Sequence, residues 1–600
     1  MGDLNLFLIL MMAFAMYWYF YIVGETVLVL MKQKFHRYFS PLIGYVIFSY
    51  IFFILFHVTT NFFAVFSAFL SLLLGCLLLQ KTRGIQVSRP PWRALSLALG
   101  VAGYVIYILY PKFSEGGFFW SVPLFDHMKI AFTAQIAQTG IPVANPFCAF
   151  PEKTYYYFLY HVPLAVMKIV FGATSYEVEL SGGMLSCLVG YQLMVGCICL
   201  LKGKECSWVE VVTCFVFSFM GRKIPGVFEG HGFDPILETV LWTPNTFLAA
   251  FCLIFSLFWI HRNKFSQAYI PALLISVILG LSPYIFLVAF GGLSLFCVYE
   301  FCLSKAKKIF FIQAVKLAAL VFLFSLPILL IQWGITNTHE FLIKFSIFPW
   351  KNIANPIDKT IGFWTVFLLS EMPIIFLINL VCLKISDIKK WHILYFSVLA
   401  SFGVSYCLRS MISNNDLGWR ASFVGIALLT ILAAYHVGNI KNWILKIIVI
   451  TMSLYFISFP YLDEKHKYVI PLSNETISAI QRYVKQDDYF LNNITRDKMM
   501  RDDWEINSNH EFATITERRS CYMSFEGVRA HCTHDLRKLN KTVKRIFNGS
   551  VSLDDINAAK NIKCNKFIFH NSDPNWDKDE LLTSFGLRKI YENNQIKIWE

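Results

Sequence analysis

Between two groups of apolar segments the chain reads PLFDHMKIAFTAQIAQTGIPVANPFCAFPEKTYYYFLYHVPLAVMKIVFG, at residues 123–172. This stretch is too polar to cross a bilayer twice, since each crossing takes about 20 mostly apolar residues. Apolar residues recur at i, i+4 and i+7: Ile130, Ala134 and Ala137. Polar residues fall off that stripe: Lys129, Thr133 and Gln138. The spacing predicts an amphipathic helix that lies in the membrane interface and begins at Asp126.

The composition of the whole chain is that of a polytopic membrane protein. Of its 600 residues, 56% are hydrophobic, 17% are aromatic and only 15% are charged, which excludes a soluble enzyme and a disordered chain. The net charge is +14, but Lys and Arg number 22 against 21 Asp and Glu from Tyr461 onward, and 31 against 18 before it. The basic excess therefore belongs to the membrane part and indicates orientation in a bilayer, not nucleic-acid binding.

Fourteen apolar runs are long enough to predict transmembrane helices. They lie near residues 4–31, 41–59, 61–80, 94–111, 176–201, 207–222, 241–260, 268–282, 284–303, 310–333, 361–383, 391–411, 420–437 and 443–460. The run 268–303 is divided at Ser282-Pro283, because proline disfavours an uninterrupted helix. We therefore expect a mainly α fold with about 14 transmembrane helices.

The charged residues predict which loops share a side. Short loops hold 19 of the 31 Lys and Arg residues before Tyr461: 32–40, 81–93, 202–206, 261–267, 304–309, 384–390 and 438–446. The positive-inside rule places them in the cytoplasm. The remaining loops hold nine of the 18 acidic residues and would lie outside with the C-terminal tail: 112–175, 223–240, 334–360 and 412–419. We expect a multi-pass protein of the bacterial inner membrane with a periplasmic tail; the alternative is the ER membrane with a lumenal tail.

The chain divides into three predicted parts. Residues 1–93 form a three-helix membrane extension, 94–460 form the transmembrane core with its large first outer loop 112–175, and 461–600 form a soluble α/β domain. In the tail, Ser473 can cap a helix. Strands are expected near 488–492 and 566–570, a helix near 534–547, and a hairpin at 587–599 that turns at Asn593-Asn594.

Asp126 and His127 are the first candidate site. A carboxylate at the start of an interfacial helix can act as a general base or organise a metal ion and a phosphate; the alternative is that Asp126 only caps the helix.

The order of features around Asp126 resembles the first outer loop of the GT-C superfamily, the integral-membrane glycosyltransferases that use polyprenyl-phosphate sugars. Asp126 is followed by a helix that ends at Thr139-Gly140, then by Ile141-Pro142 and Asn145-Pro146, and then by a second interfacial helix at 155–172 with Tyr156 and His161. Many relatives carry two acidic residues at this motif, whereas here His127 follows Asp126. The resemblance therefore implies no certain cofactor, and a divalent cation (Mg or Mn) is the alternative. The chain has no W-W-D-Y-G run, which does not support an oligosaccharyltransferase subunit.

A second group of polar residues lies in the loop 223–240, at Glu229, His231, Asp234 and Glu238. His231, Asp234 and Glu238 would share one helix face and could hold a cation. The neighbouring Pro235 instead favours Asp234 as an N-cap. His231 then stays a candidate for substrate contact.

A third group is Asn415, Asp416 and Arg420. Asn415 or Asp416 can cap the helix that follows. Arg420 is unusual there, because the dipole of a helix start disfavours a cation and basic residues are sparse outside. Helix-start amides with a guanidinium make a phosphate site; the alternative is that Arg420 pairs with Asp416.

The resemblance implies transfer of a sugar from a polyprenyl-phosphate donor to a lipid, glycan or protein acceptor on the outer face. Asp126 would be the catalytic residue and Arg420 would hold the donor phosphate. The other substrate-binding candidates are His127, Glu152, Tyr156, His161, His231, Asp234, Asn415 and Asp416. The rival hypotheses are a lipid or glycan transporter (flippase), which would pair charges near the bilayer midplane, and a non-catalytic scaffold that presents the tail.

Overall fold

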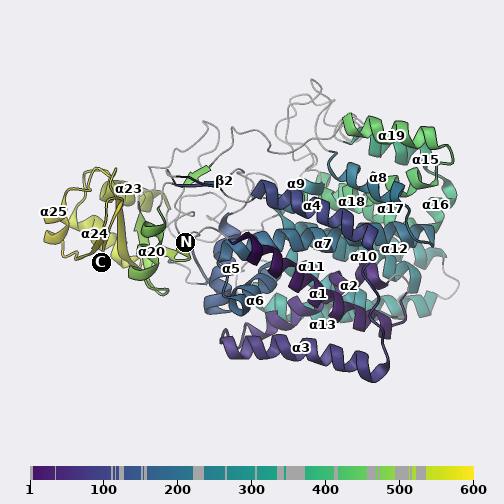
Figure 1. Cartoon of the computed structure of the whole chain (residues 1–600), viewed down its shortest axis with the longest axis horizontal. Helices are drawn as coiled ribbons and strands as arrows, with labels where there is room; N and C mark the ends of the chain where they lie inside the picture. The colour runs from purple at the N-terminus through teal and green to yellow at the C-terminus, as the bar shows by residue number, and fades with distance from the viewer. Residues whose placement is uncertain are drawn as a thin grey trace.

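The computed structural model consists of a large helical body and a smaller α/β domain at the C-terminus (Figure 1). It describes residues 5–33, 36–109, 112–114, 117–120, 127–149, 153–154, 158–220, 236–263, 267–303, 307–333, 343–345, 372–410, 416–455, 468–470, 473–492, 513, 516–521 and 536–600. At the ends of some elements, including His127 and Asp416, only the backbone is described.

The helical body contains these helices: α1 Leu6–Leu30, α2 His36–Leu55, α3 Phe62–Arg83, α4 Trp92–Leu109, α5 His127–Thr139, α6 His161–Phe171, α7 Ser175–Lys202, α8 Trp208–Ser218, α9 Ile236–Trp242, α10 Pro244–Asn263, α11 Tyr269–Leu281, α12 Pro283–Leu303, α13 Lys307–Trp333, α15 Pro373–Cys382, α16 Ile385–Lys390, α17 His392–Cys407, α18 Asp416–Asn439 and α19 Trp443–Tyr455. A short 3-10 helix, Phe158–Tyr160, precedes α6.

Eight helices of the described residues are long and apolar enough to cross a membrane: α1, α2, α3, α7, α10, α12, α13 and α18. The chain is thus a multi-pass membrane protein by its helices, but the predicted number of fourteen is not shown. The other six predicted spans contain shorter apolar helices; α11, for example, has 13 residues, or about 20 Å, against a hydrocarbon core of about 30 Å. The predicted break is confirmed, because Ser282 is extended between α11 and α12.

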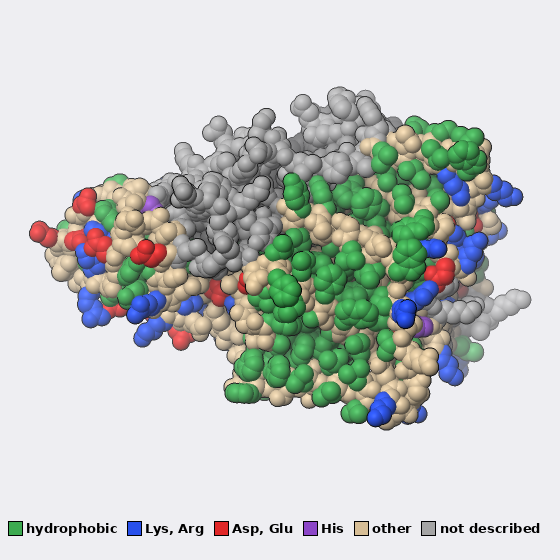
Figure 2. All heavy atoms as spheres, in the orientation of Figure 1, with side chains coloured by type: hydrophobic (Ala, Val, Ile, Leu, Met, Phe, Trp, Pro, Cys, Tyr) green, Lys and Arg blue, Asp and Glu red, His purple; other side chains and the backbone are tan. Residues whose placement is uncertain are grey.

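The helix α7 forms the centre of the body and is 94% buried over its most apolar window, whereas α3 at the edge is only 11% buried. Hydrophobic side chains cover the visible face of the body, as expected for a surface in contact with lipid tails (Figure 2). The helices α1 and α2 cross closely at Gly24. A Cβ at this position would lie 1.8 Å from the Ser40 carbonyl oxygen, so the crossing requires glycine. Both helices also pack on α7, so the predicted extension 1–93 shares its buried side chains with the core.

The prediction of an amphipathic interfacial helix after Asp126 is wrong about the exposure of its polar side chains. The helix α5 forms as predicted, but Thr133 and Gln135, off the apolar stripe, are as buried as Ile130 and Ala134. Thr133 and Gln135 point about 200° apart around the helix, so α5 is covered on more than one face and packs inside the protein. The second helix, α6, also has a buried first half, from His161 to Met167.

The C-terminal domain is a mixed α/β domain, as the sequence predicts. Its elements are α20 Asn474–Tyr483, β8 Tyr489–Asn492, β9 Arg519–Ser520, α23 Leu536–Phe547, α24 Leu553–Asn561, β10 Cys564–His570, α25 Asp579–Ser584, β11 Lys589–Glu592 and β12 Ile596–Trp599. The strand order is β11-β12-β10-β8-β9, with β8 parallel to β9 and β10. The Ser473 cap and the hairpin at Asn593-Asn594 are confirmed. The short strand β9 and the disulfide Cys521–Cys564 were not predicted.

Small sheets join segments that are distant in the chain. The strand β2 (Gly117–Trp120) pairs with β1 (Lys112–Ser114) and with β7 (Tyr468–Ile470), which links the segment after α4 to the beginning of the tail. The other two sheets pair β3 with β4 and β5 with β6: Val143–Ala144, Lys153–Thr154, Ile343–Phe345 and Leu408–Ser410.

Candidate functional site

The helix α5 begins directly after Asp126 and is fixed at its far end by a tight turn. Gly140 has φ +73° there, and a Cβ at this position would meet the Phe56 carbonyl oxygen at 2.4 Å. The next residue, Ile141, donates its backbone N–H to the same carbonyl at 2.9 Å. Only glycine combines this backbone conformation with this close approach, so the turn anchors α5 to the end of α2.

In its middle, α5 is joined to α6 by a buried polar contact. Thr133 Oγ1 lies 2.9 Å from His161 Nδ1, and both residues are at most 1% exposed. His161, expected to line a substrate cavity, is therefore a partner of α5 in the packed interior. Its ring also packs beside Phe132 and Tyr160.

Arg420 is the second predicted site residue whose side chain is described. It is 5% exposed, and its guanidinium carbon lies 5.6 Å from the centre of the Tyr284 ring, a cation–π arrangement. The helix α18 begins at Asp416, four residues before the predicted start at 420, so Arg420 lies one turn inside the helix and not in its first turn.

The remaining predicted residues fall in two groups. His127 and Asp416 are the first residues of α5 and α18, as the capping argument expects, and only their backbone is described. Those that lie outside the described residues are Asp126, Glu152, Tyr156, His231, Asp234 and Asn415. The helices that follow Asp126, Asp234 and Asn415 are α5, α9 and α18, and all three contact α7. One central helix therefore contacts the helix that follows each of the three marked segments.

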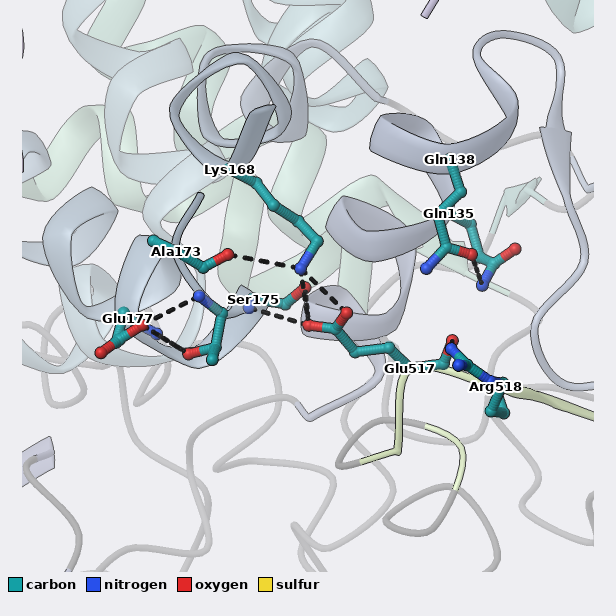
Figure 3. A network of polar contacts seen from close by, with 9 residues as sticks. Gln135, Gln138, Lys168, Ala173, Ser175, Glu177, Glu517 and Arg518 are labelled. Carbon is teal, nitrogen blue, oxygen red and sulfur yellow. Dashed lines mark hydrogen bonds and ion pairs between the residues drawn. The ribbon is translucent and has the colours of Figure 1, made fainter. Parts of the chain in front are cut away.

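The C-terminal domain docks onto this region through residues 516–521 (Figure 3). Glu517 accepts hydrogen bonds from Lys168 Nζ at 2.8 and 2.9 Å, near the end of α6. It also accepts from Ser175 at the start of α7, through the backbone N–H at 3.0 Å and the hydroxyl at 2.7 Å. Burial alone would raise the pKa of Glu517, but the Lys168 ammonium and the hydrogen bonds from Lys168 and Ser175 outweigh burial and hold the pKa below its usual value.

Two arginines beside Glu517 have different partners. Arg519 Nε donates to Gln135 Oε1 of α5 at 3.1 Å, in a buried contact. Arg518 points back into its own domain, where it donates to the carbonyls of Val484 and Gln481, both at 2.5 Å. Arg519 therefore joins the domain to α5, whereas Arg518 stabilises the domain itself.

The docking segment also extends the sheet of the C-terminal domain. The backbone N–H of Ser520 donates to the Pro146 carbonyl at 2.8 Å, and the N–H of Ala149 donates to the Cys521 carbonyl at 3.3 Å. Residues 146–149, in the segment between α5 and α6, thus cover the β9 edge, which would otherwise expose unpaired backbone groups. Backbone pairing and side-chain contacts together attach the domain to the helical body.

Sequence reasoning missed Gln135, Lys168, Glu517 and Arg519. The partners are 349 residues apart in the pair Lys168–Glu517 and 384 apart in the pair Gln135–Arg519, and no local spacing marks such pairs. A metal site receives no support from the described residues, among which no group of three or more His, Cys, Asp or Glu side chains stands close enough to bind an ion. The cation-binding alternative at Glu229, His231, Asp234 and Glu238 lies outside the described side chains.

Comparison with known proteins gives two findings. The chain is 24% identical to the "Uncharacterized protein y4nK" of Sinorhizobium fredii (strain NBRC 101917 / NGR234) over 523 residues, which cover 76% of this chain and 77% of that protein. Residues 470–600 match the family described as the Y4nK C-terminal Rossmann-like domain. The similarity to y4nK thus extends well beyond the tail, and the tail is a Rossmann-like domain of mixed α/β structure, in agreement with its sheet.

Proposed function

We propose that the protein is an integral-membrane glycosyltransferase of the GT-C type, which moves a sugar from a polyprenyl-phosphate donor to a lipid, glycan or protein acceptor on the outer membrane face. The observation that carries this proposal is the packing of α5, α9 and α18 on α7. The helices that follow Asp126, Asp234 and Asn415 come after three separate loops, and each of them contacts α7. Acceptor activation and donor binding need groups from several segments in one place, and this packing supports such a convergence.

In the proposed reaction, the acceptor hydroxyl oxygen bonds to the anomeric carbon while the bond from that carbon to the phosphate oxygen breaks. Asp126 takes the hydroxyl proton as general base, and the leaving polyprenyl phosphate departs with the electron pair. Arg420, held over Tyr284, neutralises the phosphate charge from α18. A divalent cation (Mg or Mn) at the phosphate is the open alternative in this scheme.

Two observations support placing the reaction outside the cytoplasm. Lys and Arg side chains gather at the end of the body opposite the C-terminal domain, as the positive-inside rule expects of cytoplasmic loops (Figure 2). The C-terminal domain contains the disulfide Cys521–Cys564, and structural disulfides persist in oxidising compartments. The domain and the first outer loop would then face the periplasm, in a chain with about 14 spans.

The test is the Asp126→Asn variant. Asparagine keeps the size and the capping ability of aspartate, so the melting temperature should stay within about a degree of wild type. Loss of a general base should lower sugar transfer by about 10²–10⁴-fold. The assay is transfer from a polyprenyl-phosphate sugar in reconstituted membranes, with Asp577→Asn as the matched control, since Asp577 is an exposed residue of the C-terminal domain. Wild-type turnover by Asp126→Asn would refute the catalytic role.

A further inference from the structure

The contact between Arg519 and Gln135 joins the C-terminal domain to the helix that carries the proposed catalytic residue at its start. Arg519 is 8% exposed and Gln135 is 1% exposed, and the bond between them is 3.1 Å long. A charge-assisted hydrogen bond in a buried setting is stronger than a neutral one at the surface. It is therefore a directional link between two parts of the chain.

The Arg519 side chain is itself held in place within the C-terminal domain. Its guanidinium carbon lies 5.7 Å from the centre of the Tyr489 ring, and Arg519 and Tyr489 are paired across β9 and β8. Asp487 lies 3.5 Å from the guanidinium. A planar group packed on an aromatic ring loses little further freedom when it binds, so Arg519 is presented to Gln135 in a fixed direction.

The Gln135 end of this link lies on a helix that the helical body also anchors. Thr133 is joined to His161, and Ile141 is joined to the Phe56 carbonyl. These anchors belong to the helical body, and Arg519 supplies another from the C-terminal domain. Gln135 lies eight residues, about 12 Å, from the start of α5, so a small tilt of the helix at Gln135 displaces its first turn.

We propose that Arg519 is a positioning residue for the transfer reaction: through Gln135, the C-terminal domain fixes the orientation of α5 and thereby the place of Asp126. This inference rests on the proposed function. It gives the Rossmann-like domain a structural role in the reaction that does not require the domain to bind a substrate. Arg519 acts through α5 and does not touch the reacting atoms.

The test compares Arg519→Ala with Arg518→Ala in the full-length protein. Both variants remove a guanidinium from neighbouring positions, but only Arg519 reaches α5. We expect Arg519→Ala to lower kcat by about 10–100-fold, because a displacement of about 1 Å from a remote mutation can cost about 10²-fold. The donor KM should change by less than about twofold, because Arg420 binds the donor phosphate from another helix. Arg518→Ala should keep kcat within about twofold of wild type.

Gln135→Ala provides a second variant that leaves the C-terminal domain intact. It should reproduce the loss in kcat, and the double variant with Arg519→Ala should be no worse than the more damaged single variant, because both remove one bond. If Arg519→Ala fails to fold, Gln135→Ala alone decides the question. A kcat loss in Arg518→Ala equal to that in Arg519→Ala, or additive losses in the double variant, would overturn the positioning role.

A readout independent of sugar transfer separates this inference from the proposed function. Hydrogen exchange of the amides in residues 130–139 should be faster in Arg519→Ala and Gln135→Ala than in wild type, and unchanged in Arg518→Ala. If wild-type protein transfers no sugar while this exchange pattern is found, the proposed function fails and the link between the domain and α5 stands. Equal exchange in residues 130–139 for all variants and wild type would refute the link, whatever the activity.

Discussion

Replacement of Glu517 by glutamine should loosen the docking of the C-terminal domain by an amount that the structure allows us to work out. The change keeps the size of the side chain and removes its charge. In wild type, the carboxylate accepts two hydrogen bonds from Lys168 and two from Ser175. The side chains of Lys168 and Glu517 are only 15% and 11% exposed, so the pair is largely shielded from water.

Removal of one partner from a buried ion pair costs about 3–5 kcal/mol, because the remaining charge is left uncompensated. Here the loss should lie below that range. The glutamine oxygen still accepts from Ser175, and Lys168 also donates to the Ala173 carbonyl at 3.4 Å. We expect about 2–3 kcal/mol, which corresponds to a roughly 30- to 150-fold larger population of the undocked state.

The backbone amide of Ser175 reports this change directly. Ser175 is the first residue of α7, and the first four N–H groups of a helix have no partner within the helix. Its protection from hydrogen exchange therefore depends on Glu517. Exchange at Ser175 should accelerate roughly 30- to 150-fold in Glu517→Gln, whereas the amide of Val178, bonded to the Thr174 carbonyl, should be unaffected.

Asp577→Asn is the matched control, because Asp577 is an acidic residue of the same domain with an exposed side chain. Its loss should cost less than about 0.5 kcal/mol and leave Ser175 protected. Unchanged protection of Ser175 in Glu517→Gln would refute the reasoning, since it would mean that the carboxylate does not hold the domain in place.

Three further predictions concern single groups. The folded-state pKa of Glu517 lies below its ordinary value of 4.5, so its contribution to docking should be complete above pH 4.5 and be lost as the pH falls through the lower pKa. Hydrogen exchange at the Ser175 amide should therefore accelerate in acid, and this acceleration should vanish in Glu517→Gln. Gly140→Ala should lower the melting temperature more than Gly172→Ala. Both residues have positive φ, which costs alanine about 1 kcal/mol, but only at Gly140 would the added Cβ also clash with the Phe56 carbonyl. Equal losses in melting temperature would contradict this close approach. Arg420→Lys should raise the donor KM about fivefold, since lysine reproduces neither the guanidinium fork nor the full cation–π contact, worth about 1 kcal/mol; an unchanged donor KM would argue against phosphate binding.

Local sequence patterns determined where several helices and strands of this protein begin and end. Proline after Ser282 ends one helix and begins the next, Ser473 caps α20, and the Asn593-Asn594 turn closes the last hairpin. Each of these signals acts within a few residues, so it has the same effect whatever surrounds it. The total of apolar residues likewise identified a multi-pass membrane protein, because burial in lipid requires them.

Tertiary structure decided how those elements are used. The periodicity of α5 predicted a helix on the membrane surface, but His161 contacts Thr133 on one face of α5 and Arg519 contacts Gln135 on another. The separation into a membrane core and a soluble tail was likewise visible in the composition, whereas the attachment of the tail through Glu517 was not. Partners that lie hundreds of residues apart leave no periodic signal, because their distance is set by the path of the folded chain and not by the spacing of residues along it.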